Sequence, residues 1–202
     1  SNGLDDDQQA IQDLAYNFAK NELLPNAHDW DVNKYFPKET YRKAGELGFA
    51  SVYIDSEYGG LGLGRLEACI SFEGLATGCV SFSAYLSIHS MCTWMVDCFG
   101  THEQKKEWLP DMISMNKFNS YCLTEPGSGS DAAAMKTTAK ESGDDYVLNG
   151  TKAFISGGGM SDNYIIMCKT GEKEVSCLKV DKDSKGLSFG AQESKMGWNL
   201  QP

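Results

Sequence analysis

In this 202-residue sequence, a β-type run leads into a loop of small residues and hydroxyls at Tyr121-Cys122-Leu123-Thr124-Glu125-Pro126-Gly127-Ser128-Gly129-Ser130-Asp131. Glycines in this stretch let the backbone approach a ligand closely, and the hydroxyls of Thr124, Ser128 and Ser130 can bind phosphate or carbonyl oxygens. On composition alone, a glycine-rich connection with solvated hydroxyls is the commoner explanation. The stretch also lacks the Gly-Lys-Ser/Thr ending of a Walker phosphate loop. It is therefore a candidate ligand cradle that needs support from elsewhere in the chain.

Helical periodicity dominates the residues before this stretch. Ile11, Leu14, Ala15 and Phe18 follow the i, i+3, i+4, i+7 spacing of one helix face. Pro25 is expected to end that helix, because proline cannot continue the hydrogen-bond ladder.

A second helix is expected to begin at Pro37 and to end at Gly48. Proline suits the first helical turn, and glycine can supply the left-handed cap. Residues 49–54 are expected to form a short extended piece, and residues 57–64 are too rich in glycine for either helix or strand.

Helical spacing resumes at Arg65, breaks at Gly78 and continues over residues 81–99. The segment 81–99 is apolar on nearly all sides, which is typical of a helix inside a bundle. Thr101 and Gln104 have the spacing of a capping box and predict the start of a last helix.

Short β-type runs follow Lys117, separated by Gly, Asn, Asp and Ser clusters. They cover residues 118–123, 136–140, 146–148, 152–155, 164–169 and 175–180. Asn149-Gly150 gives the strongest hairpin signal in the chain. Helices first and strands second predict the α+β class, with an all-helical domain over residues 1–117 and a separate antiparallel β domain over residues 118–202.

Composition excludes several classes of partner. The formal charge of −10, from 18 basic and 28 acidic side chains, argues against nucleic acid, whose binding depends on neutralising phosphates. No stretch approaches the roughly 18 apolar residues of a membrane span.

The chain has seven cysteines, which form no C-x-x-C pair and lie mostly in apolar runs. They are therefore expected to be buried free thiols in a reducing compartment.

A second candidate ligand segment is Lys152-Ala153-Phe154-Ile155-Ser156-Gly157-Gly158-Gly159. Phe154 could pack on a planar ring while Ser156 hydrogen-bonds to its polar edge, although core packing is the commoner role of a phenylalanine.

His28, His89 and His102 lack the spacing of metal ligands, so no metal site is expected. His89 lies inside the apolar helix and is expected to be a hydrogen-bonded core residue.

Residues 121–131 resemble the signature of the acyl-CoA dehydrogenase family, and Asn149-Gly150-Thr151-Lys152-Ala153-Phe154-Ile155-Ser156-Gly157 resembles its second flavin-contacting segment. Further matches are Tyr58-Gly59-Gly60 and Phe99-Gly100-Thr101-His102-Glu103-Gln104-Lys105, so the similarity covers essentially the whole chain. Two such segments in this order are specific enough to overturn the commoner explanations given above.

The resemblance implies an N-terminal helical domain, an antiparallel β-barrel-like middle domain and a C-terminal four-helix domain, with FAD held between the last two. The residues that it places against FAD are Tyr121, Cys122, Leu123, Thr124, Glu125, Pro126, Gly127, Ser128, Gly129, Ser130, Phe154, Ile155 and Ser156, with Ser130 also facing the acyl-CoA substrate. Many relatives carry tryptophan where this chain has Phe154. The general-base glutamate is expected beyond residue 202, so no carboxylate of this chain is assigned to catalysis, and electron-transferring flavoprotein is the expected electron acceptor.

Three further segments narrow the resemblance to members that act on short branched acyl-CoA: residues 76–79, 87–95 and 197–202. The reaction implied is the conversion of isobutyryl-CoA to methacrylyl-CoA in valine breakdown; another short-chain or short-branched specificity is the alternative. The uncharged segment 81–99, with Tyr85, Leu86 and Ile88, is expected to help close the acyl pocket. The family also implies a homotetramer in the mitochondrial matrix.

The β domain is expected to be incomplete within these 202 residues, with a sheet edge open to pairing. The chain alone is therefore expected to bind FAD weakly or not at all and to have no dehydrogenase activity. The rival hypothesis, from another functional class, is a non-catalytic assembly module that keeps only the fold and its protein contacts.

Overall fold

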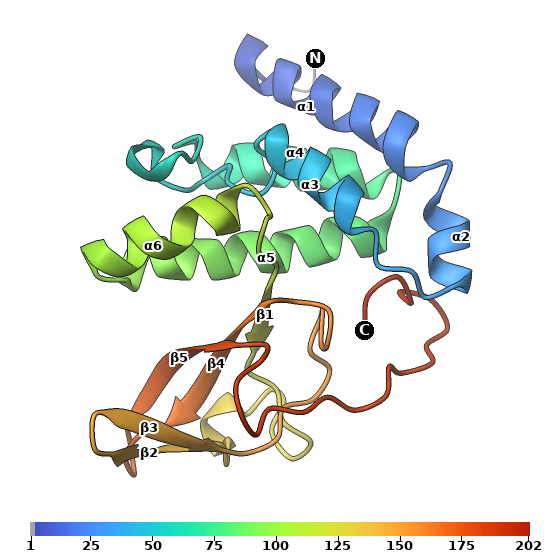
Figure 1. Ribbon diagram of the computed structural model, residues 1–202. Coiled ribbons are helices and arrows are strands. Elements are labelled where there is room, and N and C mark those ends of the chain that lie inside the picture. The colour runs from blue at the N-terminus through green and yellow to red at the C-terminus, as the bar shows by residue number, and fades with distance from the viewer. Residues whose placement is uncertain (1–2) are drawn as a thin grey trace.

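The computed structural model describes residues 3–202, which form a layer of helices joined to a small five-stranded sheet (Figure 1). The α-helices are α1 (Asp6–Phe18), α2 (Ala27–Val32), α3 (Lys38–Glu46), α4 (Arg65–Ala76), α5 (Val80–Phe99) and α6 (His102–Ile113). The strands are β1 (Asn119–Cys122), β2 (Thr138–Ser142), β3 (Asp145–Asn149), β4 (Asn163–Lys169) and β5 (Val175–Asp181). None of the helices within residues 3–202 has the length and apolarity needed to cross a bilayer.

Local sequence signals account for most of the helix boundaries. Asp5 caps α1 through a 2.8 Å bond from the Gln8 N–H, and a π-helical turn at Ala19–Leu23 carries the chain to its end before Pro25, as predicted. Gly48 has a φ of +85° after α3, as its capping role requires. The capping box at the start of α6 is also present.

In the helical half, one helix was not predicted and one expectation was wrong. The short helix α2 was missed, because it buries only Trp30 and has no apolar stripe to reveal it. Residues 49–54 form turns instead of an extended piece. Phe49, Ala50, Val52 and Ile54 are buried, so their run of apolar side chains reflects burial beneath the helices.

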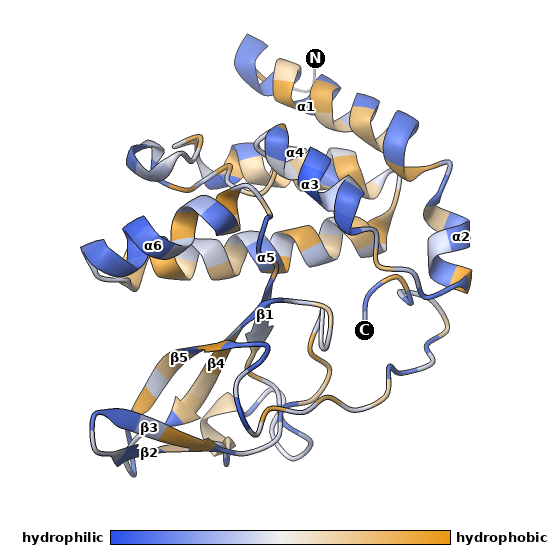
Figure 2. Cartoon of the chain, in the orientation of Figure 1, coloured by the Kyte–Doolittle hydropathy of each residue, from blue (hydrophilic) through white to orange (hydrophobic). Residues whose placement is uncertain are grey.

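An aromatic cluster centred on α5 forms the core of the helical layer. Tyr41 of α3 stacks on Phe82 with ring centroids 4.0 Å apart, and Tyr85 packs edge-on against Phe36 at 4.8 Å. Phe118, immediately before β1, joins the same cluster. Figure 2 shows that α5 carries few strongly hydrophilic residues whereas α6 carries many, as expected of an inner and an outer helix.

The sheet is mixed, so the prediction of an antiparallel domain was wrong. β1 runs parallel to β4, with Tyr121 opposite Ile165, and β2 meets β4 in parallel at Thr138 and Lys169. β2–β3 and β4–β5 are antiparallel pairs. A two-residue side-chain period marks a strand but carries no direction, and the long excursion between β1 and β4 permits a parallel crossover.

The expected hairpin at Asn149-Gly150 was also misplaced. The β2–β3 hairpin turns between Ser142 and Asp145, where Gly143 has a φ of +67°. Gly150 instead packs against Thr137, whose Oγ1 would lie 2.3 Å from a Cβ at position 150. Residues 152–155 are likewise a loop and not a strand.

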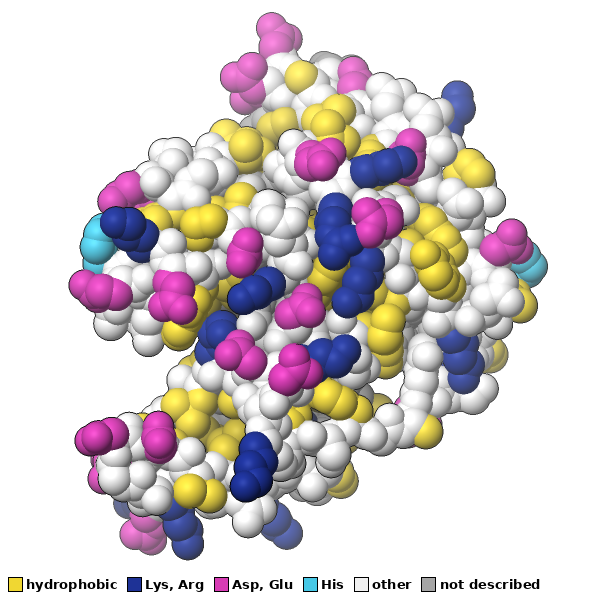
Figure 3. All heavy atoms as spheres, viewed as in Figure 1, with side chains coloured by type: hydrophobic (Ala, Val, Ile, Leu, Met, Phe, Trp, Pro, Cys, Tyr) yellow, Lys and Arg dark blue, Asp and Glu magenta, His cyan; other side chains and the backbone are white. Residues whose placement is uncertain are grey.

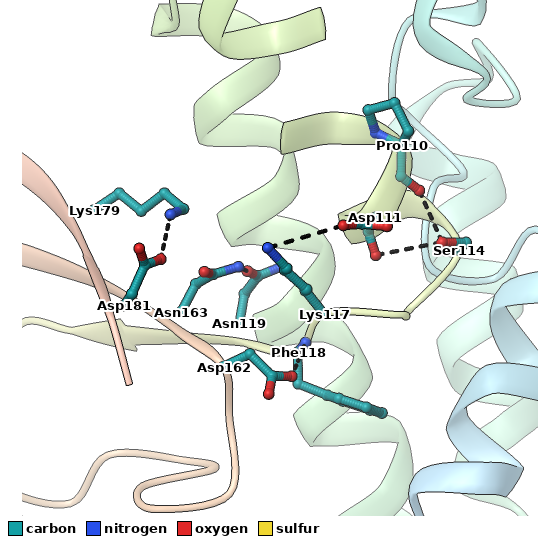
Figure 4. Close-up of polar contacts among 10 residues, drawn as sticks. All are labelled: Pro110, Asp111, Ser114, Lys117, Phe118, Asn119, Asp162, Asn163, Lys179 and Asp181. Carbon is teal, nitrogen blue, oxygen red and sulfur yellow. Dashed lines mark hydrogen bonds and ion pairs between the residues drawn. The ribbon is translucent and has the colours of Figure 1, made fainter. Parts of the chain in front are cut away.

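Polar contacts just after Lys117 fix the start of β1 to the start of β4 (Figure 4). The Phe118 N–H donates to Asp162 Oδ2 at 2.9 Å, and Asn163 Nδ2 donates to Asn119 Oδ1 at 2.9 Å. His89 of α5 is fully buried, as predicted, with Nε2 2.8 Å from the Met112 carbonyl oxygen and Nδ1 3.1 Å from the Asn119 nitrogen. The first strand is therefore fixed to α5 and α6 where it enters the sheet.

The last residues return to the helical layer beside α2 (Figure 1). The Asn199 N–H donates to Asp31 Oδ1 at 2.6 Å, and the side chains of Leu200 and Gln201 are fully buried.

All seven cysteines are free thiols, but Cys69, Cys98 and Cys177 are exposed, so the expectation of burial fails for these three.

Candidate functional site

The two candidate segments lie side by side at the end of β1. Glu125 and Ser128 close a tight turn through reciprocal backbone hydrogen bonds of 2.9 and 3.1 Å. The Ala153 N–H donates to the Thr124 carbonyl at 2.9 Å, which brings the second segment against the first. Residues almost thirty positions apart thus form one surface.

A buried ion pair holds this surface together. Glu125 accepts hydrogen bonds from the N–H groups of Lys136 (2.6 Å) and Thr137 (3.0 Å) and from Lys152 Nζ (2.9 Å). Lys152 Nζ also donates to the Leu123 carbonyl at 2.9 Å, and both side chains of the pair are at least 90% buried. Burial alone would raise the pKa of Glu125, but these hydrogen bonds outweigh it and lower the pKa to about 2.

Three of the residues expected at the cofactor turn their side chains inward. The Glu125 carboxylate is fully engaged by the ion pair, and the Ser128 hydroxyl donates to the Asp131 carbonyl at 2.6 Å. Cys122 is 4% exposed, and burial raises the pKa of its thiol to about 12. For these positions, only backbone groups remain available to a ligand.

Other predicted residues keep free hydrogen-bonding groups. Within residues 3–202, the hydroxyls of Thr124, Ser130 and Ser156 have no hydrogen-bond partner, and the N–H groups of Gly127, Gly129 and Ser130 donate to no acceptor. A Cβ added at Gly127 or Gly129 would meet nothing within 4 Å, so the chain's own packing does not require glycine there. An unobstructed backbone with unused donors is what a close-lying polar ligand needs.

Phe154 is an exposed aromatic ring beside these groups. Its side chain is 83% exposed, which excludes the core role that composition favoured, and its φ of +57° is unusual for a residue other than glycine. Ile155 and Ser156 follow it, half-buried. A planar ligand could stack on such a ring without disturbing the core.

These features fit a flavin cofactor: an exposed aromatic face, free hydroxyls and open backbone N–H groups. Tyr121, Leu123 and Pro126 complete the surface, since none of them is buried. Within residues 3–202, no group of three His, Cys, Asp or Glu side chains could hold a metal ion.

Two hollows in the described part of the chain lie away from the candidate cofactor residues. The molecule is hollowed between α6 and β5 (Figure 3), where about 110 Å³ is lined by Trp108, Lys117 and Lys179 among others. A larger groove of about 390 Å³ lies between α2, the α4–α5 turn and residues 197–200. Neither hollow includes a candidate cofactor residue.

One face of α5 is left half-exposed. Ala84, Ser87, Ile88 and Met91 lie on it at helical spacing, and each is half-buried. Tyr85 and Leu86, which were expected beside an acyl chain, are fully buried in the core, so only Ile88 of the three expected residues can line a pocket.

Sequence reasoning missed a hydrogen-bonded cluster behind the second segment. It consists of Tyr85, Ser120 and Ser161, all fully buried, and it reaches the Ser156 carbonyl. No motif marks these residues, because they come from three distant places in the chain.

Two family patterns match the chain: "Acyl-CoA dehydrogenase, N-terminal domain" over residues 5–116 and "Acyl-CoA dehydrogenase, middle domain" over residues 120–202. Two curated relatives named "Isobutyryl-CoA dehydrogenase, mitochondrial" are each 52% identical to it. The relative from Bos taurus aligns over 100% of this chain and 49% of its own length, and that from Dictyostelium discoideum over 99% and 49%. A solved acyl-CoA dehydrogenase complexed with FAD, from Bacillus anthracis, has a TM-score of 0.90 at 31% identity and covers 99% of this chain and 35% of that one. The chain therefore spans about half the length of the curated relatives it matches.

Proposed function

This chain belongs to the acyl-CoA dehydrogenase family, and on that premise we propose that it forms the helical and flavin-facing parts of an FAD-dependent enzyme that oxidises a short branched acyl-CoA. The observation that carries the proposal is the joining of the two candidate segments into one face with unused hydrogen-bond donors. The similarity to a relative complexed with FAD supports the choice of cofactor.

The residues of this face have distinct roles in the proposal. Thr124 and Ser156 donate hydrogen bonds to the polar edge of the flavin ring, Phe154 covers part of the ring, and Gly127 and Gly129 let the backbone approach the phosphate-bearing chain. Ser130 faces the acyl-CoA. When bound, FAD supplies the acceptor for a hydride from the β-carbon of the thioester. The protein's part is to hold that acceptor and the acyl chain in contact.

Glu125 is not the general base of this reaction. Its carboxylate accepts three hydrogen bonds and has a pKa of about 2, so it binds a proton too weakly to remove one from carbon. The proposal therefore keeps the base glutamate outside residues 1–202, as the family implies.

We propose isobutyryl-CoA as the substrate. The names of the two relatives at 52% identity support this choice. The half-exposed face of α5 is also suitable, because Ala84, Ser87, Ile88 and Met91 are uncharged and of small to medium size. The product is methacrylyl-CoA, and the pathway is valine breakdown.

The proposed setting takes its compartment from the same relatives, and its oligomeric state and electron acceptor from the family resemblance. We assign the full-length protein to the mitochondrial matrix as a homotetramer that passes electrons to electron-transferring flavoprotein. The word "mitochondrial" in the names of both relatives supports the compartment.

The proposal is tested by FAD titration and steady-state assays on the full-length protein. The variant Thr124→Val/Ser156→Ala should lose FAD affinity by roughly tenfold or more, since each hydroxyl contributes about 0.5–1.5 kcal/mol. Thr170→Val is the control, because within residues 3–202 the Thr170 hydroxyl bonds only to the Ser176 hydroxyl of β5, at 2.8 Å. Equal FAD affinity in both variants would contradict the assigned contacts. A higher kcat/KM for a straight-chain acyl-CoA than for isobutyryl-CoA would contradict the substrate.

A further inference from the structure

A chain of buried hydroxyls connects α5 to the second flavin-facing segment. Tyr85 Oη lies 2.7 Å from Ser161 Oγ, Ser161 Oγ lies 2.8 Å from Ser120 Oγ, and Ser120 Oγ lies 2.6 Å from the Ser156 carbonyl oxygen. Tyr85, Ser120 and Ser161 are all fully buried. Hydrogen bonds in such a dry interior are electrostatically strong and reinforce one another.

The chain ends on a group that can only accept a hydrogen bond. A carbonyl oxygen can only accept, so the single Ser120 hydrogen is donated to Ser156. When Ser120 donates to Ser156, the hydrogen between Ser161 and Ser120 comes from Ser161, and the hydrogen between Tyr85 and Ser161 comes from Tyr85. The Tyr85 hydroxyl also lies 3.2 Å from the Asn119 carbonyl oxygen, a second acceptor at the start of β1. The Tyr85 hydroxyl is thus tied both to β1 and, through Ser161 and Ser120, to the Ser156 carbonyl.

That carbonyl determines how the next N–H is aimed. The peptide between Ser156 and Gly157 is trans, so its N–H points opposite to its carbonyl. With the carbonyl held inward by Ser120, the Gly157 N–H points away from the hydroxyl chain, and within residues 3–202 it donates to no acceptor.

The ring of Tyr85 supports the same peptide by contact. Gly157 has a φ of +81°, and a Cβ added there would lie 2.5 Å from Tyr85 Cε2. The loop is therefore seated directly on this tyrosine, with no room for a side chain between them.

We propose that Tyr85 is a positioning residue for the flavin-facing loop: through Ser161 and Ser120, its hydroxyl holds the Ser156–Gly157 peptide so that the Gly157 N–H and the Ser156 side chain are presented to the cofactor. This inference rests on the proposed function. It adds a residue from the helical domain, remote in sequence from both flavin-facing segments, to the determinants of flavin binding.

The test compares Tyr85→Phe with Tyr41→Phe. Both remove one buried hydroxyl from the same aromatic cluster, in which the two rings lie 5.1 Å apart, but the Tyr41 hydroxyl contacts the Phe82 carbonyl at 3.4 Å and nothing in the loop. In the 202-residue chain without flavin, amide hydrogen exchange is followed at Gly158 and Ser161, whose N–H groups donate to Ile155 and Gly157. Tyr85→Phe should raise exchange at these two amides by roughly three- to tenfold over Tyr41→Phe, the effect of losing one buried hydrogen bond.

The second readout is the bound flavin of the full-length protein. Tyr85→Phe should shift the flavin absorbance band and lower kcat by roughly three- to tenfold with an unchanged KM for the acyl-CoA, whereas Tyr41→Phe should change neither. Because Tyr85 acts through Ser120, Tyr85→Phe/Ser120→Ala should be no worse than Ser120→Ala.

The two possible failures can be told apart. If wild-type protein binds FAD and oxidises acyl-CoA while Tyr85→Phe matches Tyr41→Phe in both readouts, the positioning role is wrong and the proposed function stands. If wild-type full-length protein binds no FAD, the proposed function is wrong and the flavin-directed part of the inference fails with it, even where Tyr85→Phe loosens the loop.

Discussion

Glu125→Gln replaces a buried carboxylate with a neutral amide of nearly the same shape. The native carboxylate accepts from two backbone N–H groups and from Lys152 Nζ, at 2.6 to 3.0 Å. The amide NH₂ of glutamine must face at least one of these donors, and Lys152 is left as a buried cation without its counter-ion. The loop around residue 125 and the adjoining segment at residue 153 should therefore both loosen.

The pKa of Glu125 sets the size of the effect. A fall from 4.5 in the unfolded chain to about 2 in the fold corresponds to roughly 3 kcal/mol of folding stability at pH 7. Because the folded pKa is depressed, this contribution is present above pH 4.5 and is lost as the pH falls toward 2. The same relation leaves about 2 kcal/mol at pH 3.5.

Urea unfolding followed by circular dichroism measures the effect at both pH values. The stability difference between wild type and Glu125→Gln should be about 3 kcal/mol at pH 7 and about 2 kcal/mol at pH 3.5. Other titrations, such as that of His89, occur in both proteins and cancel. Glu141→Gln is the control, since Glu141 is exposed and accepts only a 3.4 Å bond from Tyr146, and it should change stability by less than about 0.5 kcal/mol. A difference for Glu125→Gln below about 1 kcal/mol at pH 7, or one that does not shrink in acid, would refute the reasoning.

Three further predictions concern the site and the core. Gly129→Val should leave the unfolding midpoint almost unchanged, because nothing lies within 4 Å of the added Cβ, yet it should abolish FAD binding in the full-length protein; retained FAD affinity would show that no ligand approaches this backbone. Ile88→Phe, on the half-exposed face of α5, should lower kcat/KM for isobutyryl-CoA by roughly tenfold or more, and an unchanged ranking of acyl-CoA substrates would remove this face from the acyl pocket. Burial lowers the pKa of His89 to about 4, so the fold loses stability as the pH falls from 6.5 toward 4; wild type should lose about 2 kcal/mol between pH 7 and pH 5 that His89→Gln does not lose, and parallel pH profiles would contradict a neutral buried imidazole.

Local signals in the sequence predict most of the helical layer. Caps at Gly48 and Thr101 act through backbone conformation and nearby hydrogen bonds, so their effect is visible within four residues of the chain. The direction of β1 against β4 is not encoded locally, and the sheet was wrongly expected to be antiparallel. Likewise, Gly150 was assigned to a hairpin although it is needed for close contact with Thr137.

The candidate site, too, is predictable from the sequence in part only. Its two segments are predictable because their glycines and hydroxyls lie together in sequence. The inward roles of Glu125 and Ser128 are not predictable, because they depend on partners brought in by folding. The exposure of Phe154 and the support from Tyr85 are also properties of the folded chain.

Anaerobic titration of the full-length protein with isobutyryl-CoA, followed by visible absorbance, tests the central claim most directly. The account predicts a yellow protein whose oxidised-flavin band bleaches as isobutyryl-CoA is added, because hydride transfer reduces the bound flavin. A protein that binds no flavin, or whose flavin no short acyl-CoA bleaches, would contradict the account and favour a non-catalytic assembly role. Bleaching by a different short acyl-CoA alone would keep the dehydrogenase and discard the proposed substrate.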